Sequence, residues 1–159
     1  MLTLIVAPNP ILRQKAKPIP VPVSPTTHQL AQEMLLAMEH YHGIGLAAPQ
    51  VGQSVRLIVI ATPEQPTAYL NPEIKQHSWR KVNFEEGCLS LPGVYGDVRR
   101  PSRVLASYTT IAGEQKEEWL TGLIARVYQH EVDHLNGVLF TDLTKKITNG
   151  AELLATYEL

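Results

Sequence analysis

The sequence has a single cysteine, almost no excess of charge of either sign and no long apolar run. One cysteine among 159 residues excludes an internal disulfide. The formal net charge is −1 and no long basic stripe appears, so the charge pattern typical of nucleic-acid-binding proteins is missing. No apolar stretch approaches the ~20 residues of a membrane span, and the apolar run at residues 2–7 is too short for a signal peptide. We therefore expect no membrane segment and a reducing compartment.

The most informative residues that are present form the stretch His130-Glu131-Val132-Asp133-His134. A helix turns about 100° per residue, so two histidines four positions apart lie one turn apart on the same face and can bind one metal ion. Glu131 lies beside them, where a base for metal-bound water belongs. Thr121 is a candidate helix cap and Asn136-Gly137 a stop signal. The stretch predicts the helix of a zinc-type hydrolase.

Two imidazoles need a third ligand to hold a catalytic ion. A metzincin would place a third histidine at position 140, and that residue is Phe140, so this class is excluded. A thermolysin-like site would use a downstream carboxylate, and only Glu152 and Glu158 are available. The alternative lies upstream, where Cys88, as a thiolate, would complete a set of one cysteine and two histidines.

Three segments, in order, resemble the signature motifs of the peptide deformylase family. They are Gly43-Ile44-Gly45-Leu46-Ala47-Ala48-Pro49-Gln50, then Glu86-Gly87-Cys88-Leu89-Ser90, then Gln129-His130-Glu131-Val132-Asp133-His134. The resemblance also extends between the motifs and covers roughly residues 5–143. Three motifs in the family's order are far more specific than any one of them.

The resemblance implies a metal site and a mechanism. One divalent ion is held by Cys88, His130 and His134, with Fe²⁺ expected in the cell and Zn²⁺, Ni²⁺ or Co²⁺ able to replace it. Glu131 serves as the base for the attacking water. The side-chain amide of Gln50 and the backbone N–H of Leu89 stabilise the oxyanion.

The substrate that the resemblance implies is the N-formyl-methionyl end of a nascent polypeptide, hydrolysed to formate and a free amine. By motif position, the candidates for the methionine pocket are Ile44, Phe84, Leu123 and Val127, and the other interpretation of all four is ordinary core. Gly45 would pair with the substrate backbone in the manner of a strand.

Other interpretations remain open from the residues alone. A metalloprotease with Glu152 as third ligand would cleave internal peptide bonds and tolerate Cys88→Ser. A non-catalytic metal-binding descendant would need a fourth protein ligand. A Cys88 nucleophile with His130 as its base would leave His134 and Glu131 without a role.

The expected fold is α+β, with short antiparallel or mixed sheets around the metal-binding helix. We expect one domain over residues 1–159, of which 143–159 form a C-terminal tail with a weak helix at 151–157. A core-facing helix is predicted from Pro25 to Tyr41, with its methionines in the core. Strands are predicted at 55–60, 69–77 and 79–85, and a hairpin at 103–111 and 114–120. Residues 93–101 are interpreted as turn-rich, and Arg99-Arg100 as solvated surface.

The expected location is the cytoplasm, most simply of a bacterium. An organellar origin would require a transit peptide that has been removed, and none is visible. In some members of the family the C-terminal region helps docking at the ribosome, so the resemblance leaves a transient ribosome contact open.

Overall fold

The computed structural model describes residues 1–159 and has an α+β arrangement, in which most strands follow one another between two α-helices. The α-helices are α1 (Pro25–His40) and α2 (Gly122–Leu135). The strands are β1 (Gly45–Ala47), β2 (Leu57–Ala61), β3 (Pro66–His77), β4 (Lys81–Gly87), β5 (Tyr95–Pro101), β6 (Arg103–Thr109), β7 (Gln115–Thr121) and β8 (Lys146–Asn149). Short 3₁₀ helices are η1 (Pro10–Arg13), η2 (Ala48–Val51), η3 (Phe140–Asp142) and η4 (Ala151–Leu153).

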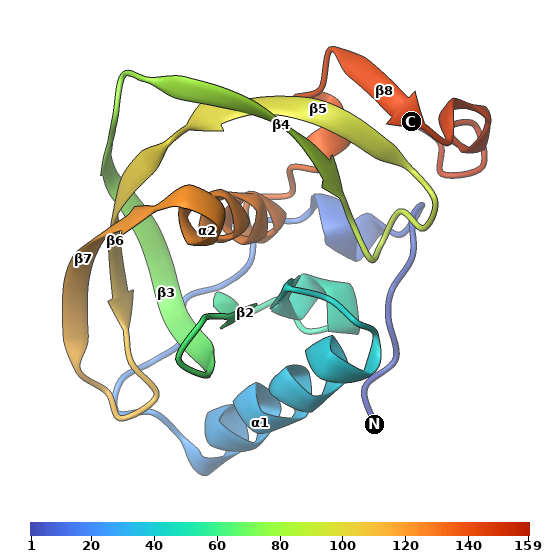
Figure 1. Ribbon diagram of the computed structural model, residues 1–159. Helices are drawn as coiled ribbons and strands as arrows, with labels where there is room; N and C mark the ends of the chain where they lie inside the picture. Colours follow the sequence, from blue (N-terminus) through green and yellow to red (C-terminus); the bar gives the residue numbers. More distant parts are fainter.

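The strands form two antiparallel sheets, and α2 lies between them. The larger sheet has the order β1-β2-β3-β6-β7, and the smaller has the order β4-β5-β8. Figure 1 shows α2 at the centre of the molecule, with β4 and β5 passing over it and α1 on the far side of β2. The predicted fold class is confirmed by this arrangement and by the solved structures described below. No helix is long and apolar enough to cross a membrane.

The helix α2 is held in place by its buried face. Ala125, Tyr128, Val132 and Leu135 pack in a core cluster with side chains of the larger sheet, and Tyr128 and Leu135 are fully buried. The helix begins after Thr121, which occupies the N-cap position, but its hydroxyl makes no capping hydrogen bond. The sequence therefore predicted the start of the helix correctly and the role of this side chain wrongly.

The helix α1 is packed as its sequence predicts, and the structure adds a cap at its start. The Thr27 N–H donates to Ser24 Oγ over 3.2 Å, and Pro25 occupies the first turn, where its missing N–H costs nothing. Met34 and Met38 are at most 2% exposed. They are packing residues, as expected.

Several predicted boundaries differ from the structure. The predicted hairpin corresponds to β6 and β7, but the segment interpreted as turn-rich contains the regular strand β5. Its alternation was hidden because two of its buried inward positions are Gly96 and Arg100 rather than apolar residues. The strand expected at 79–85 begins at Lys81, and β1 and β8 were not predicted. The weak helix expected at 151–157 is reduced to the single turn η4.

Candidate active site and metal centre

Three potential metal ligands come together between α2 and the loop after β4. His130 and His134 lie one turn apart on α2, with their Nε2 atoms 3.2 Å from each other. Cys88 Sγ lies 3.3 Å from His134 Nε2, and one ligand atom of each residue falls within 4.8 Å of the others. Metal–nitrogen and metal–sulfur bonds of about 2.0 and 2.3 Å fit within a cluster of this size.

The state of the two histidines suits a metal ion. Glu86 Oε1 accepts a hydrogen bond from His130 Nδ1 over 2.9 Å, which leaves Nε2 free to bind on the side of Cys88. Burial lowers the pKa of His134 well below its ordinary value, so this imidazole is neutral and keeps a lone pair. His134 Nε2 faces both Cys88 Sγ and His130 Nε2, so it is the ring atom that would bind the ion. The residues present therefore fit a bound divalent ion.

Glu131 lies next to these ligands with its carboxyl group buried. The residue is 4% exposed, and its Oε2 atom has no hydrogen-bond partner. Burial raises the pKa of Glu131 to about 7. A Cβ at Gly45 would lie only 2.5 Å from Glu131 Oε1, so any other residue there would have to displace the carboxyl group. A carboxyl group with this pKa can accept and return a proton near neutral pH.

Gln50 is fixed by hydrogen bonds at both ends of its amide. Its Oε1 accepts from the Ala47 N–H over 2.9 Å, and its Nε2 donates to Ser90 Oγ over 3.2 Å. Nε2 also lies 3.5 Å from Cys88 Sγ, which places this donor beside the metal cluster. The N–H of Leu89, the residue after Cys88, donates to no acceptor within the protein. Of the two predicted oxyanion donors, Leu89 thus follows Cys88 in its loop, and Gln50 reaches Cys88 from η2.

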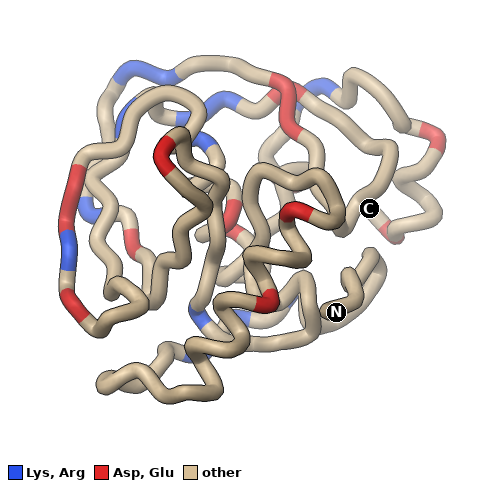
Figure 2. The backbone as a smooth tube through the Cα atoms, turned by 60° about the horizontal axis from the view of Figure 1, so that its bottom comes forward, with Lys and Arg blue, Asp and Glu red and all other residues tan.

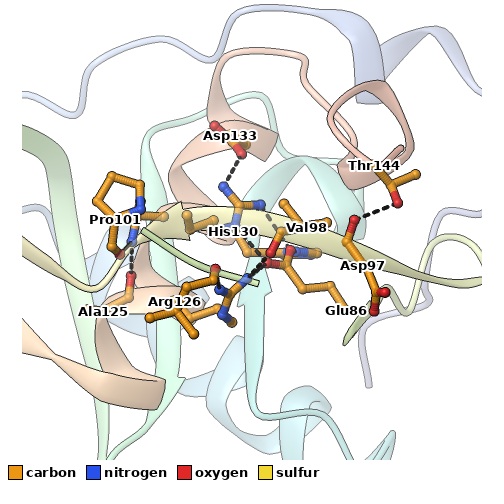
Figure 3. Close-up of polar contacts among 12 residues, drawn as sticks. Glu86, Asp97, Val98, Pro101, Ala125, Arg126, His130, Asp133 and Thr144 are labelled. Atoms are coloured by element: carbon orange, nitrogen blue, oxygen red, sulfur yellow. Dashed lines mark hydrogen bonds and ion pairs between the residues drawn. The ribbon is translucent and has the colours of Figure 1, made fainter. Parts of the chain in front are cut away.

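A buried ion network holds His130 on the side away from Cys88, and Figure 3 shows Glu86, Arg126 and Asp133 of this network on either side of β5. Glu86 accepts from Arg100 Nε over 2.6 Å, from Arg126 Nη1 over 2.6 Å and from His130. Arg100 also pairs with Asp133 over 2.8 Å. Burial by itself would raise the pKa of Glu86, but the hydrogen bonds and charges of His130 and Arg100 outweigh it and hold the pKa at about 2.

The prediction that Arg100 is solvated surface is wrong, because the residue is only 5% exposed. It lies on β5 opposite Val82 and points inward, while Arg99 is exposed. Strand alternation would have separated the two arginines if residues 93–101 had been recognised as containing a strand. Arg126 on α2 joins the same network and also donates to Val82 O and Val98 O.

A pocket of about 550 Å³ opens onto Glu131, His130 and Cys88. All four predicted wall residues line it, as does Gly45. Ile44, Phe84 and Leu123 are 52, 56 and 55% exposed, so they are not ordinary core residues. Val127 is 6% exposed and belongs to both the core and the pocket. The other interpretation of these residues, as core, is therefore wrong for three of the four.

The backbone of Gly45 faces the open edge of the larger sheet. β1 is an edge strand, and Ile44 O accepts from the Ala61 N–H across to β2. In an antiparallel pair hydrogen-bonded and non-hydrogen-bonded positions alternate, so the N–H and C=O of Gly45, opposite Ile60, point away from β2. An extended peptide could pair with this edge.

The alternative ligand, Glu152, lies outside the site. It is exposed on η4 and does not belong to the metal-binding cluster, which consists of Cys88, His130 and His134. The cluster offers three protein ligands rather than the four that a structural site needs. The arrangement thus favours neither the metalloprotease nor the non-catalytic alternative.

Known proteins resemble this chain over most of its length. A family model described as polypeptide deformylase matches residues 1–149. The peptide deformylase of a Picosynechococcus species is 51% identical over 137 residues, which are 83% of this chain and 73% of that protein. The crystal structure of peptide deformylase from Thermotoga maritima matches with a TM-score of 0.88 and 41% identity, covering 91% of this chain and 98% of that chain.

A crystal structure of a class I type b peptide deformylase from Acinetobacter baumannii, bound to Met-Ala-Ser, matches with a TM-score of 0.85. Its identity is 37%, and the match covers 90% of this chain and 98% of that chain. The range matched by the family model includes Gln50, Cys88 and the whole of α2.

Proposed function

The chain belongs to the polypeptide deformylase family, and from this premise we propose how its residues divide the reaction. It is a hydrolase that removes the N-formyl group from formyl-methionyl peptides, releasing formate and a free amine. The observation that carries the assignment of roles is the position of Glu131. Its buried carboxyl group has one unpartnered oxygen and lies in the same pocket as the metal-binding cluster.

Cys88, His130 and His134 are the residues that would hold one divalent ion. Imidazole and thiolate ligands suit Fe²⁺, which we expect as the natural ion, and also Zn²⁺, Co²⁺ and Ni²⁺. When bound, such an ion acts as a Lewis acid that lowers the pKa of a water molecule to about 7. A set of three protein ligands is typical of catalytic rather than structural sites.

Glu131 moves the proton. Its carboxylate takes a proton from the attacking water and, in its protonated form, gives it to the nitrogen that leaves with the peptide. The pKa of about 7 supports both steps near neutral pH. Because Gly45 has no side chain, the carboxyl group can approach the substrate carbonyl beside β1.

Gln50 and Leu89 stabilise the negative charge that develops on the formyl oxygen. The Ala47 N–H anchors the Gln50 amide, so Nε2 is directed toward Cys88 without any rearrangement. The unpartnered Leu89 N–H supplies the second donor. Preorganised donors of this kind contribute more than flexible ones because they do not reorient during the reaction.

Substrate binding uses the edge of β1 and the exposed apolar wall of the pocket. The N–H and C=O of Gly45 pair with the substrate backbone, while Ile44, Phe84, Leu123 and Val127 enclose the methionine side chain. The Met-Ala-Ser ligand of the Acinetobacter baumannii structure has the chemistry that this pocket would accept.

The test is formate release from N-formyl-Met-Ala-Ser under anaerobic conditions with Fe²⁺ or Ni²⁺ supplied. We expect Glu131→Ala to lose about 10² to 10⁴ in rate while binding one metal ion per chain, because acid–base catalysis contributes that much. Cys88→Ser should lose metal affinity. The control Glu152→Ala, at an exposed position, should keep both the rate of formate release and the metal affinity of the wild type. Normal turnover by Glu131→Ala, or inactivity of Glu152→Ala, would contradict the assignment.

We place the reaction in the bacterial cytoplasm, where nascent formylated chains are made. The bacterial sources of the similar proteins support this location. A transient ribosome contact would bring the enzyme to its substrate, and cosedimentation with ribosomes before and after salt washing would test it.

A further inference from the structure

Both tryptophans of the chain lie exposed at the same end of the molecule. Trp79, in the turn between β3 and β4, is 92% exposed, and Trp119, on β7, is 46% exposed. Tryptophan is usually largely buried in a folded chain. Neither residue lines the substrate pocket. The reaction therefore does not explain these two exposed aromatic faces.

The turn that carries Trp79 is fixed to the start of β6. The Ser78 N–H donates to Arg103 O over 3.0 Å, and the Arg103 N–H donates back to Ser78 Oγ over 3.2 Å. The Arg103 guanidinium in turn lies over the Trp119 ring, 5.3 Å from its centroid. Trp79 and Trp119 are thus joined by a short chain of contacts, and Trp79 is presented on a preorganised turn.

Unpaired cations lie beside Trp79, and one of them, Arg103, also contacts Trp119, which follows Glu117 and Glu118 on β7. Arg80, Lys81, Arg99 and Arg103 take part in none of the ion pairs of the chain. Residues 74–84 and 98–113 contain no aspartate or glutamate. Figure 2 shows Lys and Arg segments close together at the upper left of the backbone. The pairing of β4 with β5 gathers these cations from distant parts of the sequence, which is why no basic stripe is visible in it.

We propose that this tryptophan patch, formed by Trp79, Arg80, Lys81, Arg99, Arg103 and Trp119, binds single-stranded RNA. Flat aromatic side chains with flanking cations are the combination on which unpaired bases stack and phosphates are neutralised. A lipid surface would require a larger apolar face than two indoles. A second copy of this chain that docked through the same patch would place its four unpaired cations against the four of the first copy, and like charges repel. Charge complementarity therefore favours a polyanion with exposed bases.

The two tryptophans make the test direct, because they are the only ones in the chain and both belong to the patch. Titration with a 12-nucleotide oligouridine should quench the intrinsic fluorescence. For four phosphate contacts, the logarithm of the association constant should fall against the logarithm of salt concentration with a slope of about −3. Arg80→Ser/Lys81→Ser should reduce this slope to about −1.4. Trp79→Ala should weaken binding about tenfold or more, measured by fluorescence anisotropy of labelled RNA.

The matched control is Lys15→Ser/Lys17→Ser, which removes the same charge from exposed positions of the N-terminal arm. It should keep the affinity for RNA, and all of these variants should keep full deformylase activity on a formylated tripeptide. That activity readout separates a failure of RNA binding from a failure of the proposed function. Absence of quenching at low salt, equal weakening by the control, or binding to anionic vesicles without binding to RNA would each overturn the proposal.

Discussion

Glu86 is the residue whose replacement should reveal most about how the site is held together. Its carboxylate, 7% exposed, accepts hydrogen bonds from Arg100, Arg126 and His130. The change Glu86→Gln preserves the shape of the side chain but removes its charge. Arg100 would then keep only Asp133, whose side chain is 27% exposed, and Arg126 would keep no carboxylate partner.

The expected loss of stability can be worked out in two ways from the same buried contacts of Glu86. Removing one partner of a buried ion pair costs about 3–5 kcal/mol, because an uncompensated charge is left behind. The pKa of Glu86, displaced from its ordinary 4.5 to about 2, corresponds to about 3 kcal/mol of stability at neutral pH. For a chain of this size, a loss of about 3–5 kcal/mol lowers Tm by roughly 6–20 °C.

The stability that Glu86 contributes depends on pH. Because the pKa of Glu86 is lowered on folding, its contribution is fully present above about pH 4.5 and is lost as the pH falls toward 2. The acid-induced loss of stability should therefore be smaller in Glu86→Gln than in the wild type.

The assay is urea unfolding of the metal-loaded proteins at pH 7 and at several acidic pH values, together with metal affinity. The variant should also bind metal about 10- to 100-fold more weakly, because His130 loses the acceptor that orients it. The control is Glu73→Gln, whose pair with Lys75 is exposed and therefore contributes little to stability. If Glu86→Gln costs no more than Glu73→Gln, the buried network does not stabilise the fold as argued.

Three further outcomes are expected. Gln50→Ala should reduce kcat about 10²- to 10³-fold, measured by formate release, with a much smaller effect on unfolding. Gly45→Ala places a Cβ 2.5 Å from Glu131 Oε1, so kcat should fall at least about tenfold. If kcat and the pH–rate profile do not change, the carboxyl group can move aside without loss of activity. Leu123→Ala should raise KM for formyl-methionyl peptides with little change in Tm, because the residue is 55% exposed. Leu135 is fully buried, so Leu135→Ala should lower the free energy of unfolding by about 2–5 kcal/mol in a denaturant titration.

The strands were harder to predict than the helices. The hairpin of β6 and β7 follows from its alternating pattern, and α1 from its helical spacing. β5 was missed because Arg100 and Gly96 occupy inward positions where apolar residues would have indicated a strand. An arginine can point inward there only because Glu86, from the neighbouring strand, and Asp133, from α2, meet it. A local pattern cannot contain that information.

The sequence by itself determined the helix that carries His130, Glu131 and His134, since the placement of these residues relative to one another around the helix depends only on helical geometry. It also supplied the family motifs. Only the tertiary structure decided that Cys88 rather than Glu152 lies with the two histidines, and that the cations around Trp79 share one surface. The physical reason is that these approaches join segments far apart in the chain, and strand pairing and core packing, not local propensity, set their distances.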